Sequence, residues 1–130
     1  MAYEISNYSV KISVVAGGDL SAQQFKFVKL NSSGEAVVCA AITDRPIGVL
    51  QNDPTSGKVA QVLVSGGTKV VLGATVAAGA SVGITSAGAG KAVVAGTDTT
   101  QYTLGYALTG GASGEIVTAV ISCANASRAA

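Results

Sequence analysis

The chain has 130 residues, enough for one domain but not for two independent cores. Eight basic and seven acidic residues leave a net charge of +1, which argues against a nucleic-acid-binding protein, because such proteins carry a basic excess. The sequence has no stretch of about 18 apolar residues, so we expect no membrane span. Its first residues lack the basic and apolar segments of a signal peptide, so we expect no export by that route.

The low content of charged residues is informative in itself. Only 12% of the chain is charged, whereas the surface of a small soluble domain usually carries about 25–35% charged residues. The apolar fraction consists mainly of small side chains, and the aromatic residues are four Tyr and two Phe. We therefore expect much of the surface to be covered by copies of the same chain or by a partner.

Strand patterns dominate the chain. Residues 9–14 alternate polar and apolar side chains, the pattern of a half-buried strand. Residues 59–64 and 116–121 are runs rich in β-branched side chains, and the first of these is closed by the Ser-Gly-Gly sequence at 65–67. Glycines then recur every few residues, which indicates tight turns between short strands. The sequence predicts an all-β protein, a small barrel or sandwich.

One segment has helical features. Asp19 could cap a turn or two of helix over residues 19–25, with Gln23 or Gln24 near the third helical position. We therefore expect at most one short helix, in this segment.

The two parts of the chain resemble each other. A shift of 57 residues places 47–49 on 104–106, 56–57 on 113–114 and 62–65 on 119–122, and upstream, with a small insertion, 28–38 resembles 82–94. This pattern predicts a pseudo-duplicated β unit with repeats at about 28–66 and 82–123, whose halves close one core. The alternative is chance similarity in a chain rich in Gly, Ala and Val.

We divide the chain accordingly. Residues 1–15 form an N-terminal arm and the first strand, and residues 16–123 form a single β domain. Residues 124–130 are small and polar, which predicts a flexible, loosely held C-terminal tail.

The side chains needed for catalysis are missing or scattered. The chain has no His, which excludes Ser-His-Asp and Cys-His arrangements. Cys39 and Cys123 are too few for a zinc site, and we expect two reduced, buried thiols, with a disulfide as the alternative. The acidic residues are far apart in sequence, each beside a turn. We therefore predict no enzyme activity, no cofactor and no metal site.

Several ordered segments resemble a known family. Residues 46–54 (Pro-Ile-Gly-Val-Leu-Gln-Asn-Asp-Pro), followed by 56–59 and 64–66, resemble the capsid cement, or head decoration, proteins of tailed bacteriophages. The segments 1–5, 19–30 and 104–116 agree with this, and the resemblance runs from about residue 1 to residue 121. Each motif is a β-turn pattern, so the specificity lies in their order.

The resemblance implies a small β-barrel or β-tulip subunit on the outer surface of an expanded phage head. Members of this functional class commonly bind the major capsid protein as trimers at local threefold positions, after assembly in the host bacterial cytoplasm. Such a subunit stabilises the shell against the pressure of the packaged DNA, without catalysis. The resemblance marks no contact residues that can be transferred.

The N-terminal arm is our candidate for part of the capsid contact. Tyr3, Glu4, Ile5 and Tyr8 precede the first strand, and the aromatic and apolar members offer amphipathic anchors. An extended arm can also add a strand to the sheet of a partner. Alternatively, these residues pack on the barrel of their own subunit.

A second function class is a glycan- or receptor-binding β-module of a phage fibre or adhesin. Sugar sites generally combine exposed aromatic rings with carboxylates or amides. The candidate cluster in this chain is Tyr102 with Asp98, Thr100 and Gln101. A surface loop with one packed tyrosine explains the same residues.

Overall fold

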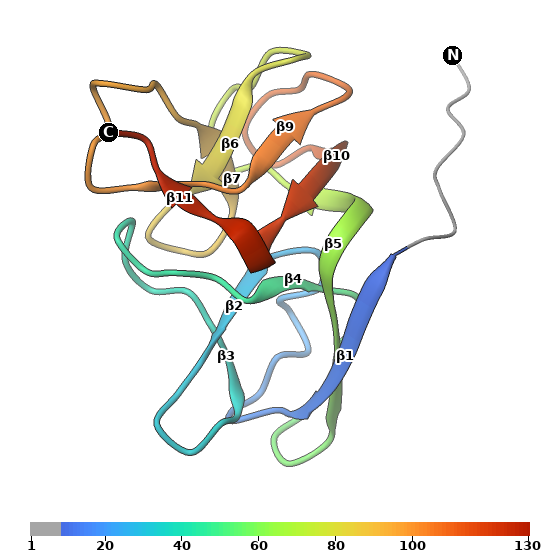
Figure 1. The fold of residues 1–130 in the computed structure, drawn as a ribbon. Coiled ribbons are helices and arrows are strands. Elements are labelled where there is room, and N and C mark those ends of the chain that lie inside the picture. Colours follow the sequence, from blue (N-terminus) through green and yellow to red (C-terminus); the bar gives the residue numbers. More distant parts are fainter. Residues whose placement is uncertain (1–8) are drawn as a thin grey trace.

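The computed structural model describes residues 9–130, and within this range the regular structure is nearly all β, as predicted (Figure 1). The helical content of this range is a single 3-10 turn, η1 (Cys123–Asn125), which the sequence does not predict. None of the described residues forms a helix long and apolar enough to cross a bilayer. The strands are β1 (Val10–Val15), β2 (Phe27–Leu30), β3 (Ala36–Val38), β4 (Gly48–Leu50), β5 (Val59–Val71), β6 (Ser81–Ile84), β7 (Gly90–Ala92), β8 (Tyr102–Thr103), β9 (Gly105–Ala107), β10 (Ile116–Ser122) and β11 (Ser127–Arg128).

One strongly curled sheet carries most of these strands. Its order is β3-β2-β4-β5-β10-β9-β6-β7, with β1 paired to β5 as a ninth strand, and all named pairs are antiparallel. β8 and β11 form a separate two-stranded ribbon. In Figure 1, β1 to β4 lie in the lower part of the molecule and β6, β7, β9 and β10 in the upper part, with β5 running through both.

β5 continues beyond the point where the sequence indicates a turn. Its first part pairs with β1 and β4, and its second part pairs with β10. Gly66 and Gly67, which suggest the end of a strand, lie within β5 and pair with Ile121 and Val120. Glycine inside a strand commonly marks a bend, and here β5 passes from one part of the molecule to the other at this point.

The pairing of the strands repeats along the chain. The hairpin β2-β3 recurs as β6-β7, and the pair formed by β4 and the first part of β5 recurs as β9 and β10. Connecting hydrogen bonds recur too: Ala16 N–H donates to the Lys58 carbonyl over 2.8 Å, and Leu72 N–H donates to the Glu115 carbonyl over 2.8 Å. The first half comprises residues 10–65 and the second half residues 66–122. In the first half, β1 pairs with the first part of β5. In the second half, the second part of β5 takes the equivalent position and pairs with β10.

Each half has an inner and an outer face, because side chains alternate along a strand. The inner face of the first half carries Val28, Leu50 and Val62, which form a small core together with Ala16, Leu20, Ala36 and Ala60. The outer face of the first half carries Phe27, Val49 and Leu63, which lie side by side across β2, β4 and β5.

The larger core lies between the two halves. It joins Phe27, Val49 and Leu63 of the first half to residues of the second half, among them Leu104 and Ile121, and all five are at most 2% exposed. The halves therefore stack head to tail, since the outer face of the first covers the inner side of the second.

The segment 19–25 forms turns instead of a helix. The Asp19 carboxylate accepts the Ser21 N–H over 3.0 Å, which closes a side-chain turn and uses the acceptor that would cap a helix. The N–H of Phe25 donates to the carbonyl of Leu50 over 2.7 Å. Because this bond joins the backbone to β4, the Phe25 N–H is not available for a helical hydrogen bond.

The last residues differ from the predicted loose tail. β11 pairs with β8, and Ala129 is 4% exposed. Its N–H donates to the Gln101 carbonyl over 2.9 Å, and its carbonyl accepts the Gly96 N–H over 2.7 Å. Small side chains allow this close packing, which nothing in the local sequence pattern indicates.

Candidate interaction surfaces

Neither a metal-ligating cluster nor a paired thiol occurs within residues 9–130. Cys39 and Cys123 are free and buried in the larger core. Burial raises the pKa of each thiol to about 12, so both stay protonated at neutral pH. The two cysteines serve as core residues.

One concavity of the described residues is an open groove on the first half. It has a volume of about 330 Å³ and is lined by Ile12, Arg45, Pro46, Ile47, Val64, Cys123 and Ala124. Its residues come from β1, from the segment before β4, from β5 and from η1. Apart from Arg45, the lining is apolar or small, which suits an apolar partner surface.

β1 borders this groove and is unusually exposed for a strand with an apolar pattern. It pairs with β5 on one side, and Val10, Ile12 and Val15 are 55%, 36% and 46% exposed. In the second half, the equivalent part of β5 is largely covered, with Val70 fully buried. β1 therefore presents an apolar surface that the other described residues, 16–130, leave uncovered.

The predicted contact residues Tyr3, Glu4, Ile5 and Tyr8 lie outside the described residues. The described chain enters β1 almost at once, at Val10. The predicted arm is therefore joined in sequence to the strand that borders the groove.

A second uncovered surface lies on the outer face of the second half. Ser81, Tyr106 and Val120 lie side by side across β6, β9 and β10. Tyr106 is 48% exposed, and Ile116, farther along β10, is 55% exposed. The sequence patterns do not predict an interaction surface at these residues. The repeat alignment, which places Tyr106 on Val49, could have indicated that they share one face of the sheet.

The wall of the groove at Arg45 and Pro46 is held by Asp44. Its carboxylate accepts the N–H groups of Ala40 and Ala41 over 2.8 and 3.0 Å and forms a 2.9 Å ion pair with Lys29. Partial desolvation raises the pKa of Asp44, but the hydrogen bonds from Ala40, Lys29 and Ala41 outweigh it, and the net pKa is lowered. The loop that leads to the groove is thus fixed by a charged side chain.

The candidate sugar-binding cluster is not assembled as a sugar site. Gln101 is 7% exposed, and Asp98 accepts the N–H of Val94 over 2.8 Å and the Gln101 amide over 3.2 Å. Tyr102 is half-buried, with the Arg128 guanidinium 5.6 Å from its ring centroid. The Asp98 carboxylate is thus engaged within its own loop, and the Tyr102 ring of β8 lies against Arg128 of β11.

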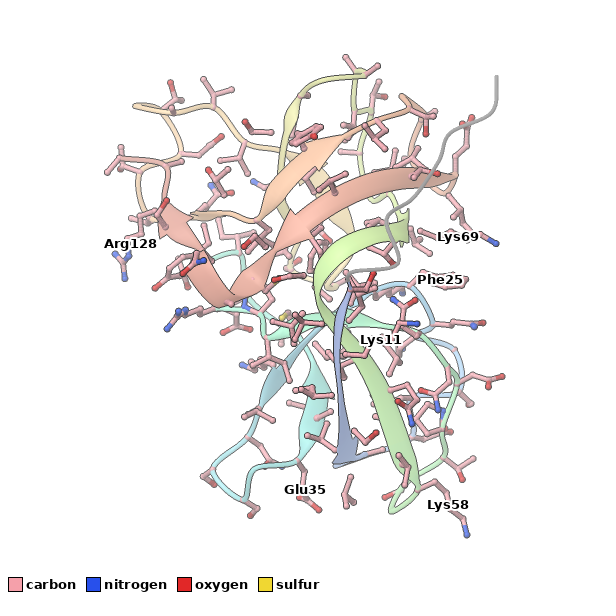
Figure 2. The ribbon with its side chains drawn as sticks, turned by 45° about the vertical axis from the view of Figure 1, so that its right-hand side comes forward. Lys11, Phe25, Glu35, Lys58, Lys69 and Arg128 are labelled. Carbon is pink, nitrogen blue, oxygen red and sulfur yellow. The ribbon has the colours of Figure 1, made fainter. Side chains whose placement is uncertain are left out.

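Charged side chains project at separate places on the molecule. Figure 2 shows Arg128 at the left, Lys69 at the right, Glu35 at the bottom and Lys58 at the bottom right.

Comparison with known proteins is informative at the level of structure. No protein-family model matches this chain, and no curated protein sequence matches it. Among solved structures, it is similar to the N base of the head fiber gp8.5 of bacteriophage phi29, with 22% sequence identity and a TM-score of 0.63. The similarity covers 88% of this chain and 95% of the other chain. The fold of this chain is therefore similar to that of a phage head fiber base.

Proposed function

We propose that this protein is a structural component of a bacteriophage head, namely a decoration or cement subunit that binds the outer surface of the expanded capsid without catalysis. The observation that carries this proposal is the fold shared with a phage head fiber base over 88% of the chain. The ordered resemblance of residues 46–54 and their neighbours to capsid cement proteins supports the same conclusion.

The surfaces of the molecule fit a binding role. β1 and the groove offer apolar area that residues 9–130 leave uncovered, and charged residues make up 12% of the chain. A contiguous uncovered apolar surface is typical of a protein-binding site. We propose the major capsid protein as one partner and further copies of this chain, as a trimer, as the other.

The mechanism requires only preferential binding. A subunit that binds the expanded lattice, and not the compact one, stabilises the expanded state by mass action. Trimerisation makes each attachment multivalent, so that weak individual contacts suffice. Tyr3, Glu4, Ile5 and Tyr8 would extend from β1 and supply part of the capsid contact.

Co-sedimentation with undecorated phage heads tests the proposal. The purified protein is mixed with compact procapsids and with expanded shells, and bound protein is measured against added protein. We expect saturable binding to expanded shells alone, at about three copies per local threefold position if the trimer binds there. Absence of binding to both forms would contradict the cement role.

A matched pair of variants tests the arm. Replacing Tyr3, Ile5 and Tyr8 by Ala should weaken binding to expanded shells. Replacing three exposed apolar residues elsewhere, Leu30, Ile42 and Val94, by Ala should leave binding unchanged. Equal loss in both variants would argue against a specific contact by the arm.

The alternative is a glycan- or receptor-binding module of a phage fibre. The observation that favours it is that the similar structure is the base of a fiber. Saturable binding to a glycan array, together with no binding to heads, would support this alternative over the cement role.

A further inference from the structure

The packing between the two halves shows how the inner side of a half is closed. In the second half, the open end of the curled sheet is lined by Thr68, Leu104 and Ile121, which are 7%, 1% and 2% exposed. The outer face of the first half covers this end and shares one core with it. A polar contact secures the edge, where the Gln51 amide donates to the Thr68 hydroxyl over 2.8 Å.

The equivalent end of the first half has no such cover among the described residues. Ile12, Ile47 and Val64 hold the places that Thr68, Leu104 and Ile121 hold in the second half, as the strand registers show for the strand residues. These three apolar side chains line the groove, and Ile12 is 36% exposed.

The outer face of the second half is the counterpart of this opening. The row Ser81, Tyr106 and Val120 repeats the row that, in the first half, packs into the interface between halves. In the second half Ser81 is exposed, Tyr106 is 48% exposed and Val120 is half-buried. The described part of each copy therefore carries one uncovered surface of each kind.

We propose that a second copy of this chain supplies the missing cover, with Tyr106 and its neighbours packing into the groove of the next copy. The contact would repeat between chains the head-to-tail packing that the halves make within a chain. The groove is also continuous with that packing, because Cys123 belongs to the larger core and lines the groove. This inference specifies the contact between copies and does not depend on capsid binding.

The chemistry of the two surfaces is compatible. A tyrosine brings a large apolar ring and a hydroxyl while losing little conformational entropy. The groove offers apolar contacts at Ile12, Pro46 and Val64, and the Arg45 guanidinium can stack on the ring or donate to its hydroxyl. Because the contact joins two different surfaces, it is heterologous, and a closed ring leaves neither surface free.

Two complementary variants test this contact by their mass in sedimentation equilibrium. Tyr106→Glu disables the outer face and Ile12→Glu disables the groove, and each variant alone should be a monomer. Their mixture should form a dimer with one copy of each, because one intact groove meets one intact outer face. The wild type should form a ring, and Leu30→Glu, at a residue with a similar exposed fraction of 44%, should keep the mass of the wild type.

Circular dichroism establishes that each variant is folded. A monomeric wild type, a mixture that stays monomeric, or a variant that keeps the ring mass would overturn the proposal. Residues 1–8 of the same chain are the competing occupant of the groove. In that case the wild type is a monomer, and thiol labelling of Val64→Cys increases only when residues 1–8 are removed. Loss of capsid binding with an intact ring would instead contradict the proposed function alone.

Discussion

Phe25 and Gly79 occupy equivalent positions in the two halves, and both have a left-handed backbone, with φ of 65° and 83°. Phe25 N–H donates to the Leu50 carbonyl over 2.7 Å, and Gly79 N–H donates to the Ala107 carbonyl over 2.7 Å. Glycine adopts this conformation without strain, whereas a residue with a Cβ pays about 1–2 kcal/mol. The ring of Phe25 offsets this, because it packs on the larger core and lies 5.6 Å from the Lys69 ammonium (Figure 2).

Truncation of Phe25 separates these two effects. Phe25→Ala loses the ring contacts and keeps the strain, while Phe25→Gly loses both. We expect Phe25→Gly to have the higher free energy of unfolding of the two variants, by about 1 kcal/mol, in urea titrations. At Val15, an ordinary strand position, Ala should be more stable than Gly. The same order at both positions would contradict the strain at Phe25.

Gly48 and Gly105 are equivalent glycines required by close approach of the neighbouring strand. A Cβ at Gly48 would collide with the Leu63 carbonyl oxygen, and a Cβ at Gly105 with the Val120 carbonyl oxygen. Gly48→Ala and Gly105→Ala should each lower the free energy of unfolding by about 3 kcal/mol, because backbone must move. Gly18→Ala is the control, since a Cβ there meets open space, and it should stay within about 0.5 kcal/mol of the wild type in thermal unfolding.

The buried thiols predict loss of stability at alkaline pH. Folding raises the pKa of Cys39 and Cys123 from 9.0 to about 12, so their protonated forms stabilise the fold fully below pH 9. This contribution is lost as the pH rises from 9 towards 12, at a limit of about 1.4 kcal/mol per pH unit for each thiol. Below pH 9, thiol reagents should react with the unfolded chain only.

The double variant Cys39→Ala/Cys123→Ala isolates this effect from the titration of Tyr and Lys. It should be less stable than the wild type at pH 7, because of the cavities left, but its stability should fall less steeply above pH 9. Parallel curves for both proteins would contradict the burial of the thiols.

Asp44 predicts loss of stability in acid. Its pKa is lower in the folded chain than the unperturbed value of 3.8, so the ionised carboxylate stabilises the fold above pH 3.8. That contribution is lost as the pH falls through the lowered pKa. Asp44→Ala should cost about 1–3 kcal/mol at pH 7, since the N–H groups of Ala40 and Ala41 lose their acceptor, and it should flatten the decline below pH 3.8.

Lys29→Met separates the ion pair from these hydrogen bonds. Lys29 and Asp44 are both partly exposed, so removal of the ammonium should cost less than about 1 kcal/mol. An effect of Lys29→Met as large as that of Asp44→Ala would assign the stabilisation to the ion pair instead.

Local sequence patterns were sufficient for much of the fold. The alternation over residues 9–14 and the β-branched runs at 59–64 and 116–121 correspond to β1, the first part of β5 and β10. These patterns are reliable because side-chain alternation and turn glycines are properties of a few neighbouring residues. The duplication was also visible, because equivalent turns kept their Gly residues.

Other features depended on contacts between distant residues. The local sequence around Asp19 is compatible with both a helix cap and a side-chain turn. The hydrogen bond from Phe25 N–H to the Leu50 carbonyl of the sheet excludes the helix. The tail is ordered by β8, which the composition of residues 124–130 does not reveal. The Ser-Gly-Gly sequence at 65–67 is a turn signal that the pairing with β10 overrides.

The sequence by itself determined the all-β class, the repeat and the missing histidine, since composition and local pattern fix these directly. Only the tertiary structure decided which faces are buried. Val49 and Tyr106 hold equivalent places in the repeat, yet Val49 is fully buried and Tyr106 is 48% exposed. The reason is that one half stacks on the other within the chain, so the first outer face is covered while the second, like the groove, stays open. Such a difference arises from packing between distant segments and leaves no mark on the local pattern.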